Sequence, residues 1–176
     1  MQLREKFLKR NTAVRGQAVN FRIDTVQLPN KKKAVREYLD HPGAVAVIAL
    51  VDPTHLILVQ QFRYPVGQVT WEIPAGKLNR GEKALPCVKR ELEEETGCRA
   101  KRIERLLSFW PTAAFANEII HLFVARGLTQ GEANPDDDEF LRTRVWSLKD
   151  AARAVQKGRI KDSKTIIALL AFKAFG

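Results

Sequence analysis

The acidic residues between positions 76 and 98 are spaced so that several of them share one side of a short helix. A helix is predicted over residues 84–96, and Glu91 then lies about one turn from both Glu94 and Glu95. Carboxylates three and four residues apart repel by roughly a few tenths of a kcal/mol per pair in solvent, and by more beside an apolar face. Because a divalent cation would reverse the sign of this interaction, the pattern points to metal chemistry.

The same predicted helix carries an apolar stripe. Leu85, Val88 and Leu92 recur at intervals of three and four residues, which predicts that this side of the helix is buried. Pro86 suits the first helical turn, and Gly97 suits the left-handed position that ends a helix. The glutamates are therefore expected on the flank of a buried face.

The length and composition indicate a globular protein. The chain has 176 residues, 45% of them hydrophobic, which is enough for one domain or for a domain with a small appendage. No apolar run approaches the ~20 residues of a membrane span, and the first residues carry scattered charges, so neither a membrane partner nor a secretory signal is expected. Cys87 and Cys98 are too few and too poorly placed for a disulfide framework, which favours a cytoplasmic location.

The charge balance limits the class of partner. A formal net charge of +10 attracts nucleic acid and small anionic substrates equally well. The positive charge is concentrated early in the chain and includes residues 31–33, for which a solvated turn is the simpler interpretation. Basic residues are not interleaved with aromatic residues in the pattern on which single strands stack. A small-molecule substrate is therefore favoured over nucleic acid.

Hydrophobic patterning predicts the elements that must position the acidic helix. Residues 44–51 form a continuous apolar run typical of a central strand, and residues 55–62 are expected to be its antiparallel partner. Further elements are predicted from the same signals. They are strands over 101–110, 119–125 and 142–146, a helix over 148–156 capped by Ser147, and a last helix through Ala174 capped by Asp162 or Ser163. This mixture indicates an α/β fold in which helices cover both faces of a mixed sheet.

The chain is predicted to divide near residue 40. Residues 1–40 would form a small N-terminal β subdomain, with a strand over 18–27, and residues 41–176 would form the main domain. A subdomain of this size is too small to be stable alone, so it must pack on the main domain or on a second subunit.

Taken position by position, the segment from 76 to 98 resembles the Nudix box, the signature of a family of hydrolases. The matching residues are Gly76, Glu82, Arg90, Glu91, Leu92, Glu94, Glu95 and Gly97. Cys98 is the one departure, because the pattern normally ends in a bulky aliphatic residue. An ordinary exposed helix with ion pairs would explain a shorter fragment, but not the full pattern. The resemblance implies a Nudix-type α/β/α sandwich that hydrolyses a nucleoside diphosphate linked to another group.

The resemblance also implies the metal ligands. Glu91 and Glu95, together with the backbone carbonyl of Ala75, are expected to bind Mg²⁺, for which Mn²⁺ can substitute. Glu94 is expected to hold a further metal or to orient the attacking water. Glu94 and Glu95 are therefore predicted to be catalytic.

Structural support for this site is expected from residues of the same box. Glu82 and Arg90 would form a pair that fixes the loop against the helix, although contact between Arg90 and phosphate is an alternative. Gly76 would allow a tight loop, and Gly97 would end the helix.

Outside the box, most of residues 20–172 resemble the ADP-ribose pyrophosphatase branch of the Nudix family. The resemblance is carried by VREYLDHPGAVAV (35–47), QQFRYPVGQVTWEIPAGK (60–77), FANEIIHLFVA (115–125) and GRIKDSKTIIALL (158–170). It implies a homodimer, because the N-terminal strands of this branch commonly exchange between subunits and complete the partner's nucleoside site.

Substrate contacts follow from this resemblance. Arg36 and Glu37 match residues near the nucleoside end of the substrate. Arg63 matches an arginine near the pyrophosphate, where a guanidinium can bind a diphosphate in a bidentate way. A surface ion pair is the alternative for Arg63.

Two loops complete the predicted site. Glu139, with Asp138 behind it, matches a late-loop carboxylate that acts as catalytic base or orients water, and a solvated acidic loop is the alternative. Ala113 and Ala114 replace a Ser-Pro-Gly turn in a loop that shapes the pocket for the terminal sugar. This departure makes nucleoside diphosphate sugars in general a firmer prediction than ADP-ribose.

The leading hypothesis is metal-dependent hydrolysis of the pyrophosphate bond in nucleoside diphosphate sugars, with ADP-ribose converted to AMP and ribose 5-phosphate. A pyrophosphohydrolase of RNA 5′ ends or of dinucleotides is the first alternative, motivated by the excess of basic residues. A non-catalytic nucleotide-sensing Nudix domain is the second. Such a domain would normally lack some of the metal-binding glutamates, all of which are present here.

Overall fold

The computed structural model describes residues 3–134 and 140–176, and the chain divides into two compact units. The larger unit comprises residues 44–109 and 120–176, and the smaller unit comprises the N-terminal residues to Gly43 together with 110–119. Among the described residues, no helix combines the length and the apolar character needed to cross a membrane.

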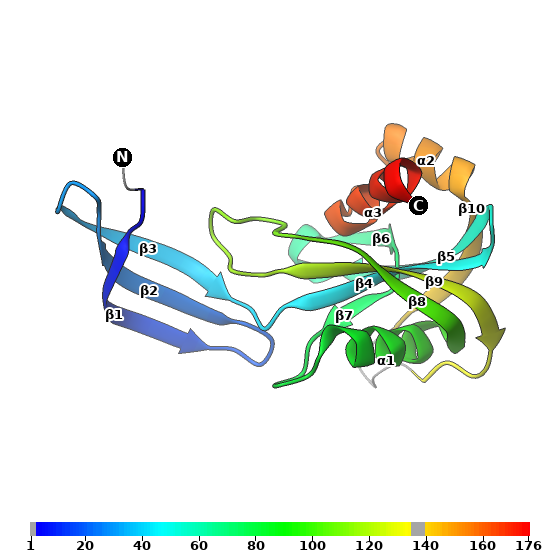
Figure 1. Ribbon diagram of the computed structural model, residues 1–176, viewed down its shortest axis with the longest axis horizontal. Helices are drawn as coiled ribbons and strands as arrows, with labels where there is room; N and C mark the ends of the chain where they lie inside the picture. The colour runs from blue at the N-terminus through cyan, green and yellow to red at the C-terminus, as the bar shows by residue number, and fades with distance from the viewer. Residues whose placement is uncertain (1–2, 135–139) are drawn as a thin grey trace. The chain divides into compact units, whose positions relative to one another are not determined.

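The larger unit is built on a mixed sheet centred on β4 (Ala44–Asp52). The strand order β10-β5-β4-β9-β8 is set by antiparallel pairing throughout, except that β9 runs parallel to β4 (Figure 1). The flanking strands are β5 (His55–Arg63), β8 (Cys98–Phe109), β9 (Ile120–Gln130) and β10 (Arg142–Ser147). Two short strands complete the sheet, with β6 (Gln68–Glu72) on β5 and β7 (Ala75–Lys77) on β4.

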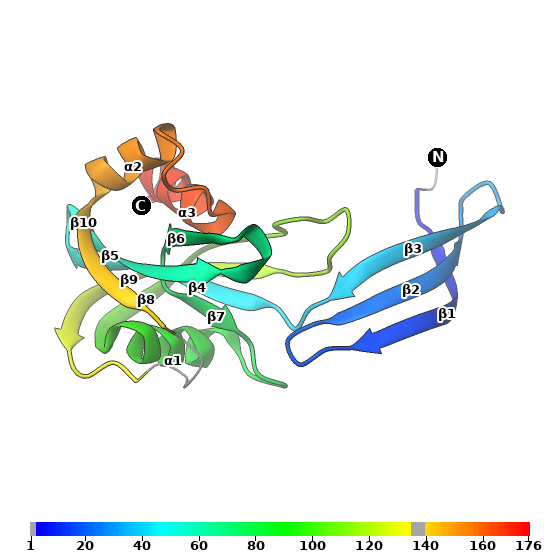
Figure 2. The same cartoon turned by 180° about the vertical axis from the view of Figure 1, so that it is seen from behind.

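The apolar run of β4 is buried on both faces of the sheet from Ala44 to Leu50, whereas Val51 is 49% exposed. Ala46 and Ile48 point to one core, and Val45 and Val47 point to the other, because successive strand residues face opposite sides. The first core packs against α2 (Leu148–Gln156) and α3 (Ser163–Phe175), and the second packs against α1 (Ala84–Thr96). Helices therefore cover both faces of the sheet, as predicted (Figure 2).

The helix ends follow from local signals. Ser147 caps α2 by accepting a hydrogen bond from the backbone N–H of Asp150, and Asp162 caps α3 by accepting one from Thr165. Gly97 ends α1 with φ of 71°, a left-handed conformation that favours glycine. The predicted bounds of α1 and both caps are confirmed.

The predicted buried stripe of α1 is wrong in one member. Leu85 is 44% exposed, whereas Val88 and Leu92 are buried as predicted. The buried face is centred on residues 87, 88, 91, 92 and 95, and at 3.6 residues per turn Leu85 lies about 90° from that centre. Glu91 and Glu95 are consequently part of the buried face rather than its flank.

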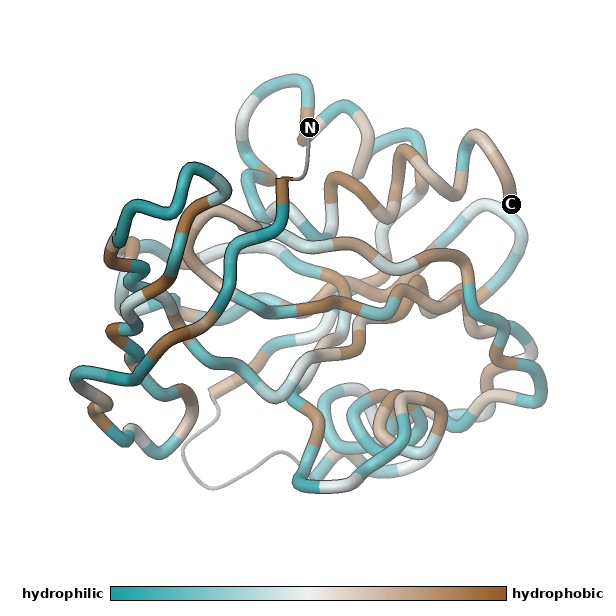
Figure 3. The backbone as a smooth tube through the Cα atoms, turned by 60° about the vertical axis from the view of Figure 1, so that its left-hand side comes forward, coloured by the Kyte–Doolittle hydropathy of each residue, from teal (hydrophilic) through white to brown (hydrophobic). Residues whose placement is uncertain are grey.

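The smaller unit contains an antiparallel sheet of three strands, β1 (Lys6–Arg15), β2 (Asn20–Gln27) and β3 (Lys33–Asp40). Only β2 was predicted. Hydrophobic and hydrophilic residues mix along these strands (Figure 3), and register shifts between Phe7 and Lys9 and between residues 10 and 12 break the alternation of β1. The segment 110–119 belongs here because Leu39 exchanges backbone hydrogen bonds with Phe115 and Asn117. The division at residue 40 stays a prediction.

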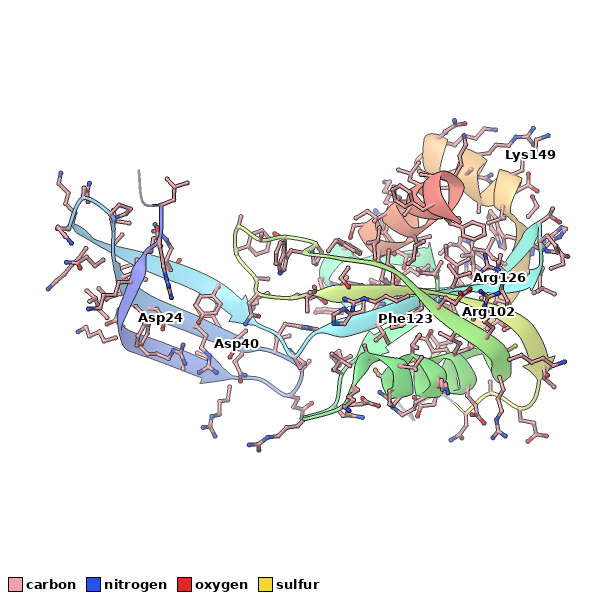
Figure 4. All side chains as sticks on the ribbon, viewed as in Figure 1. Asp24, Asp40, Arg102, Phe123, Arg126 and Lys149 are labelled. Carbon is pink, nitrogen blue, oxygen red and sulfur yellow. The ribbon has the colours of Figure 1, made fainter. Side chains whose placement is uncertain are left out.

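One face of the small sheet is polar and internally paired. Arg10 binds Asp24 through two hydrogen bonds of 2.8 and 3.0 Å, and the hydroxyl of Tyr38 donates to the same carboxylate at 3.1 Å. Arg10 holds the pKa of the Asp24 carboxyl below its usual range. Asp24 on β2 and Asp40 on β3 both lie in this sheet (Figure 4), and Asp40 is bound by Arg22.

Candidate active site

The strand β7 and the helix α1 bring two carboxylates together. The backbone N–H of Ala75 donates to Oε2 of Glu95 at 3.0 Å. A Cβ atom at Gly76 would lie 1.9 Å from the carboxyl carbon of Glu91, so glycine lets the Glu91 carboxylate take this position and any larger residue would displace it. Glu91 and Glu95, one helical turn apart and both buried, therefore converge on the same short strand.

Arg90 joins three carboxylates of the same segment. Its guanidinium donates to Glu82 at 3.2 and 3.1 Å and to Glu94 at 2.7 Å, and it forms an ion pair with Glu91 at 2.8 Å. These partners, Glu82 foremost, raise the pKa of Arg90, and Arg90 in turn lowers the pKa of Glu82. Glu82 also accepts from the backbone N–H of Asn79 at 2.9 Å, so the pair anchors the loop before α1.

The acidic cluster gathers carboxylates around one guanidinium. Arg90 forms ion pairs with Glu82, Glu91 and Glu94, and Glu95 lies one helical turn from Glu91. Carboxylate oxygens and a backbone carbonyl are hard donors that suit Mg²⁺ or Mn²⁺, so the donor set fits such an ion. Within the described residues, no three acidic, histidine or cysteine side chains are grouped closely enough to hold a metal ion by themselves. Arg90 binds Glu94, and Glu95 accepts from the backbone N–H of Ala75.

A second polar cluster lies where β5, β6 and the start of α3 meet. Arg63 binds the buried carboxylate of Glu72 in a bidentate way, at 2.9 and 2.7 Å, and Lys164 binds both Glu72 and Asp162. Burial opposes ionisation of Glu72, but Arg63 and Lys164 outweigh it and lower its pKa to about 2. The charge of Glu95 is among the causes that raise the pKa of Arg63, which places Arg63 within the field of the acidic cluster.

Sequence reasoning missed Glu72 and Lys164. They are 92 positions apart, so no local pattern pairs them. The available signals were a charged residue between Trp71 and Ile73 in an otherwise apolar stretch and a lysine two positions after the cap of the last helix.

The remaining predicted residues lie in the smaller unit or outside the described residues. Arg36 and Glu37 are exposed on β3, and Arg36 binds Glu5. Ala113 and Ala114 are exposed in the segment 110–119. Glu139 and Asp138 fall outside the part of the chain that the structure describes. The structure thus brings together the residues of the box, with Ala75 and Arg63 close to them.

Known proteins resemble this chain along most of its length. A family model described as "NUDIX domain" matches residues 40–169. The "Methanol dehydrogenase activator" of Bacillus methanolicus is 44% identical over 167 residues, which cover 94% of this chain and 90% of that protein. The "ADP-ribose pyrophosphatase" of Bacillus subtilis (strain 168) is 39% identical over 169 residues, or 95% of this chain and 91% of that protein.

The fold also matches solved structures. A crystal structure described as "ADP compounds hydrolase" superimposes with a TM-score of 0.86 over 99% of this chain and 96% of that one. Its sequence identity is 20%, so this likeness speaks for the fold alone.

Proposed function

The chain belongs to the NUDIX family of hydrolases, and we propose that it hydrolyses the pyrophosphate bond of nucleoside diphosphate sugars in a metal-dependent reaction. ADP-ribose is the first substrate to test, with AMP and ribose 5-phosphate as products. The observation that carries this proposal is the convergence of Glu91 and Glu95 on Ala75 and Gly76 within an acidic cluster that holds one arginine. The printed activities of relatives, such as ADP-ribose pyrophosphatase and GDP-mannose pyrophosphatase, support the substrate class.

The ligands proposed for Mg²⁺ or Mn²⁺ are Glu91, Glu95 and the carbonyl of Ala75, with Glu94 beside them. When bound, such an ion supplies an activated water and neutralises charge on the phosphoryl oxygens. Glu94 is proposed to orient the water or to accept its proton. Arg90 holds the Glu94 carboxylate in place by donating a hydrogen bond of 2.7 Å. Glu139 remains our proposal for a further water-orienting carboxylate.

Arg63 is proposed to bind the pyrophosphate. Arg63 donates to Glu72 from Nε and Nη2, which leaves other N–H groups of its guanidinium for a phosphoryl oxygen. The Arg63 side chain is 42% exposed. Glu72 therefore acts as a positioning residue that holds the plane of Arg63 toward the substrate.

The smaller unit is proposed to mediate a homodimer. Val14, Phe21, Val35 and Leu39 share one face of its sheet by register and are 58%, 37%, 53% and 37% exposed. An apolar face of this kind is commonly covered by another subunit. Arg36 and Glu37 would then contribute to the partner's nucleoside site.

Light scattering after size-exclusion chromatography tests this assembly. We expect a dimer at micromolar concentration, and a monomer for Phe21→Asp. A wild-type monomer would contradict the dimer without touching the proposed chemistry.

The reaction itself is tested with a panel of nucleoside diphosphate sugars. AMP or the corresponding nucleotide is measured by phosphate release after phosphatase coupling, in Mg²⁺ and in Mn²⁺. We expect release from ADP-ribose that stops with a chelator and that falls sharply in Glu95→Gln. Absence of release from every nucleotide sugar, or full activity in Glu95→Gln, would refute the proposal.

The net charge of +10 supports one alternative substrate, RNA 5′ ends or dinucleotides. Under that alternative, activity on RNA falls steeply with added salt and nucleotide sugars are not turned over. A cytoplasmic location is proposed as well, because Cys87 and Cys98 are both free and buried.

A further inference from the structure

A polar cluster that the mechanism does not use lies on strands β8 and β9. The hydroxyl of Ser108 is 2.7 Å from Nδ1 of His121, and Nη2 of Arg105 is 2.6 Å from the Ser108 hydroxyl and 3.2 Å from the same Nδ1. Ser108 and His121 are direct cross-strand partners. The three side chains therefore form one hydrogen-bonded group within the larger unit.

A β-bulge at Leu106 produces this group. The register passes from Arg105 opposite Phe123 to Leu107 opposite Leu122, which leaves Leu106 without a partner of its own. Leu106 and Leu107 both pack against the core below α2 and α3. Arg105 and Ser108, three residues apart, consequently share the opposite face of the sheet, which regular alternation would forbid.

That opposite face is the face of the acidic cluster. Gly76 on β7 is opposite Val45 on β4, Val45 is opposite His121 on β9, and His121 is opposite Ser108 on β8. Residues opposite one another in register stand on the same face of a sheet. At a strand spacing of about 4.8 Å, His121 lies about 10 Å from Gly76, over which the carboxylate of Glu91 is packed.

The hydrogen bonds fix the chemical character of the cluster. Arg105 has only donors, so Nδ1 of His121 must be the acceptor, and the ring carries its proton on Nε2. Burial, together with the charge of Arg105, lowers the pKa of His121, which favours the neutral ring. The unused groups of the cluster are thus donors: the Nε2–H of His121 and the remaining N–H groups of Arg105. Such a set binds an oxygen acceptor, and its one positive charge favours an anion.

We propose that Arg105, Ser108 and His121 form a subsite for the phosphoryl group that lies farther from Glu91 and Glu95 when a diphosphate compound is bound. This inference rests on the proposed function of the acidic cluster. Arg105 and His121 contact the phosphoryl oxygens, and Ser108 is a positioning residue that holds the imidazole in its Nε2–H tautomer.

Two substitutions of His121 separate this role from a structural one. His121→Gln places an amide N–H near the position of Nε2, whereas His121→Asn places its amide near Nδ1 and can still accept from Ser108. Phosphoryl binding is therefore kept by glutamine and lost with asparagine, while a purely structural pair is kept by asparagine. Arg105→Gln removes the charge, and Arg102→Gln is its control on the same strand but the other face (Figure 4).

Calorimetry with inorganic pyrophosphate, in the presence of Mg²⁺, measures the subsite without turnover. We expect Kd to rise about tenfold or more in His121→Asn and Arg105→Gln, and to stay near the wild-type value in His121→Gln and Arg102→Gln. Thermal unfolding shows whether each variant is folded. Arg105 is exposed, so the comparison of Arg105→Gln with Arg102→Gln still tests the subsite if a histidine variant does not fold.

Equal Kd values in all variants, weaker binding in His121→Gln than in His121→Asn, or no binding to the wild type would overturn the subsite. If wild-type protein binds pyrophosphate with the expected pattern but hydrolyses no nucleotide sugar, the subsite stands and the proposed function fails. If nucleotide sugars are hydrolysed and the KM values of His121→Asn and Arg105→Gln match that of the wild type, the subsite fails and the function stands.

Discussion

Two clusters of charged side chains in the larger unit differ in how their carboxylates are paired. Around Glu72, the buried carboxylate is held by Arg63, Lys164 and the hydroxyl of Thr70, and Lys164 also binds Asp162. Around Arg90, one guanidinium serves three carboxylates, and Glu95 adds a fourth. The first arrangement is complete within the protein and serves stability and orientation. The second gathers several carboxylates around one guanidinium, and such a set of hard oxygen donors suits a divalent cation.

The largest expected effect comes from Glu72→Ala. Removal of this buried carboxylate leaves Arg63 and Lys164 without their shared partner, and breaking a buried ion pair from one side costs about 3–5 kcal/mol. Urea unfolding measures the loss. As a control, Glu93→Ala removes an exposed carboxylate bound to Arg99 and should cost less than about 1 kcal/mol. Equal losses in the two variants would break the distinction between the clusters.

Glu95→Gln is expected to reduce activity strongly while changing stability little. The amide oxygen can still accept from the N–H of Ala75, and one of four crowded charges is removed, so stability should change by less than about 1 kcal/mol. Nucleotide-sugar hydrolysis should fall by about 100-fold, because a proposed metal ligand is lost. Steady-state kinetics and urea unfolding on the same preparation check both parts. A large loss of stability with retained kcat would show that Glu95 is structural.

Gly76→Ala tests how tightly Glu91 is held. The added methyl group would occupy the place of the Glu91 carboxylate, and overpacking of this kind costs about 1–3 kcal/mol. The double variant Gly76→Ala/Glu91→Ala should recover most of that stability but no activity. If Gly76→Ala alone is as stable and active as the wild type, the carboxylate does not need this position.

The smallest expected effect is a difference in the pH dependence of stability between the wild type and Glu72→Gln. The folded-state pKa of Glu72, about 2, lies below the ordinary value for glutamate, so its ionised form stabilises the fold at neutral pH. That contribution is full above about pH 5 and is lost as the pH falls toward 2. Thermal unfolding between pH 6 and 2 should show a smaller slope in Glu72→Gln than in the wild type. Identical slopes would mean that Glu72 does not carry this linkage.

Local signals in the sequence were sufficient for the helices and the centre of the sheet. Ser147 and Asp162 are caps because their side chains reach the next turn, and the apolar run of β4 is buried from Ala44 to Leu50. The spacing from Glu91 to Glu95 likewise predicted two carboxylates on one side of α1. These features depend on neighbours within about one turn or one strand.

Features set by distant pairing were not predictable in this way. β1, β3 and β6 depend on the strands they join, and the bulge at Leu106 depends on the register with β9. The exposure of Leu85 follows from how α1 is rotated on β7. The buried face of α1 includes Glu91 and Glu95, whose polar side chains a hydrophobic periodicity does not count.

Binding of Mn²⁺, followed by electron paramagnetic resonance, tests the difference between the two clusters most directly. Wild-type protein and Glu72→Gln should bind Mn²⁺ alike, since the cluster around Glu72 is already neutralised by Arg63 and Lys164. Glu95→Gln should bind it about 10- to 100-fold more weakly. Equal Mn²⁺ affinity in Glu95→Gln and wild-type protein would contradict the assignment of the acidic cluster as the metal site.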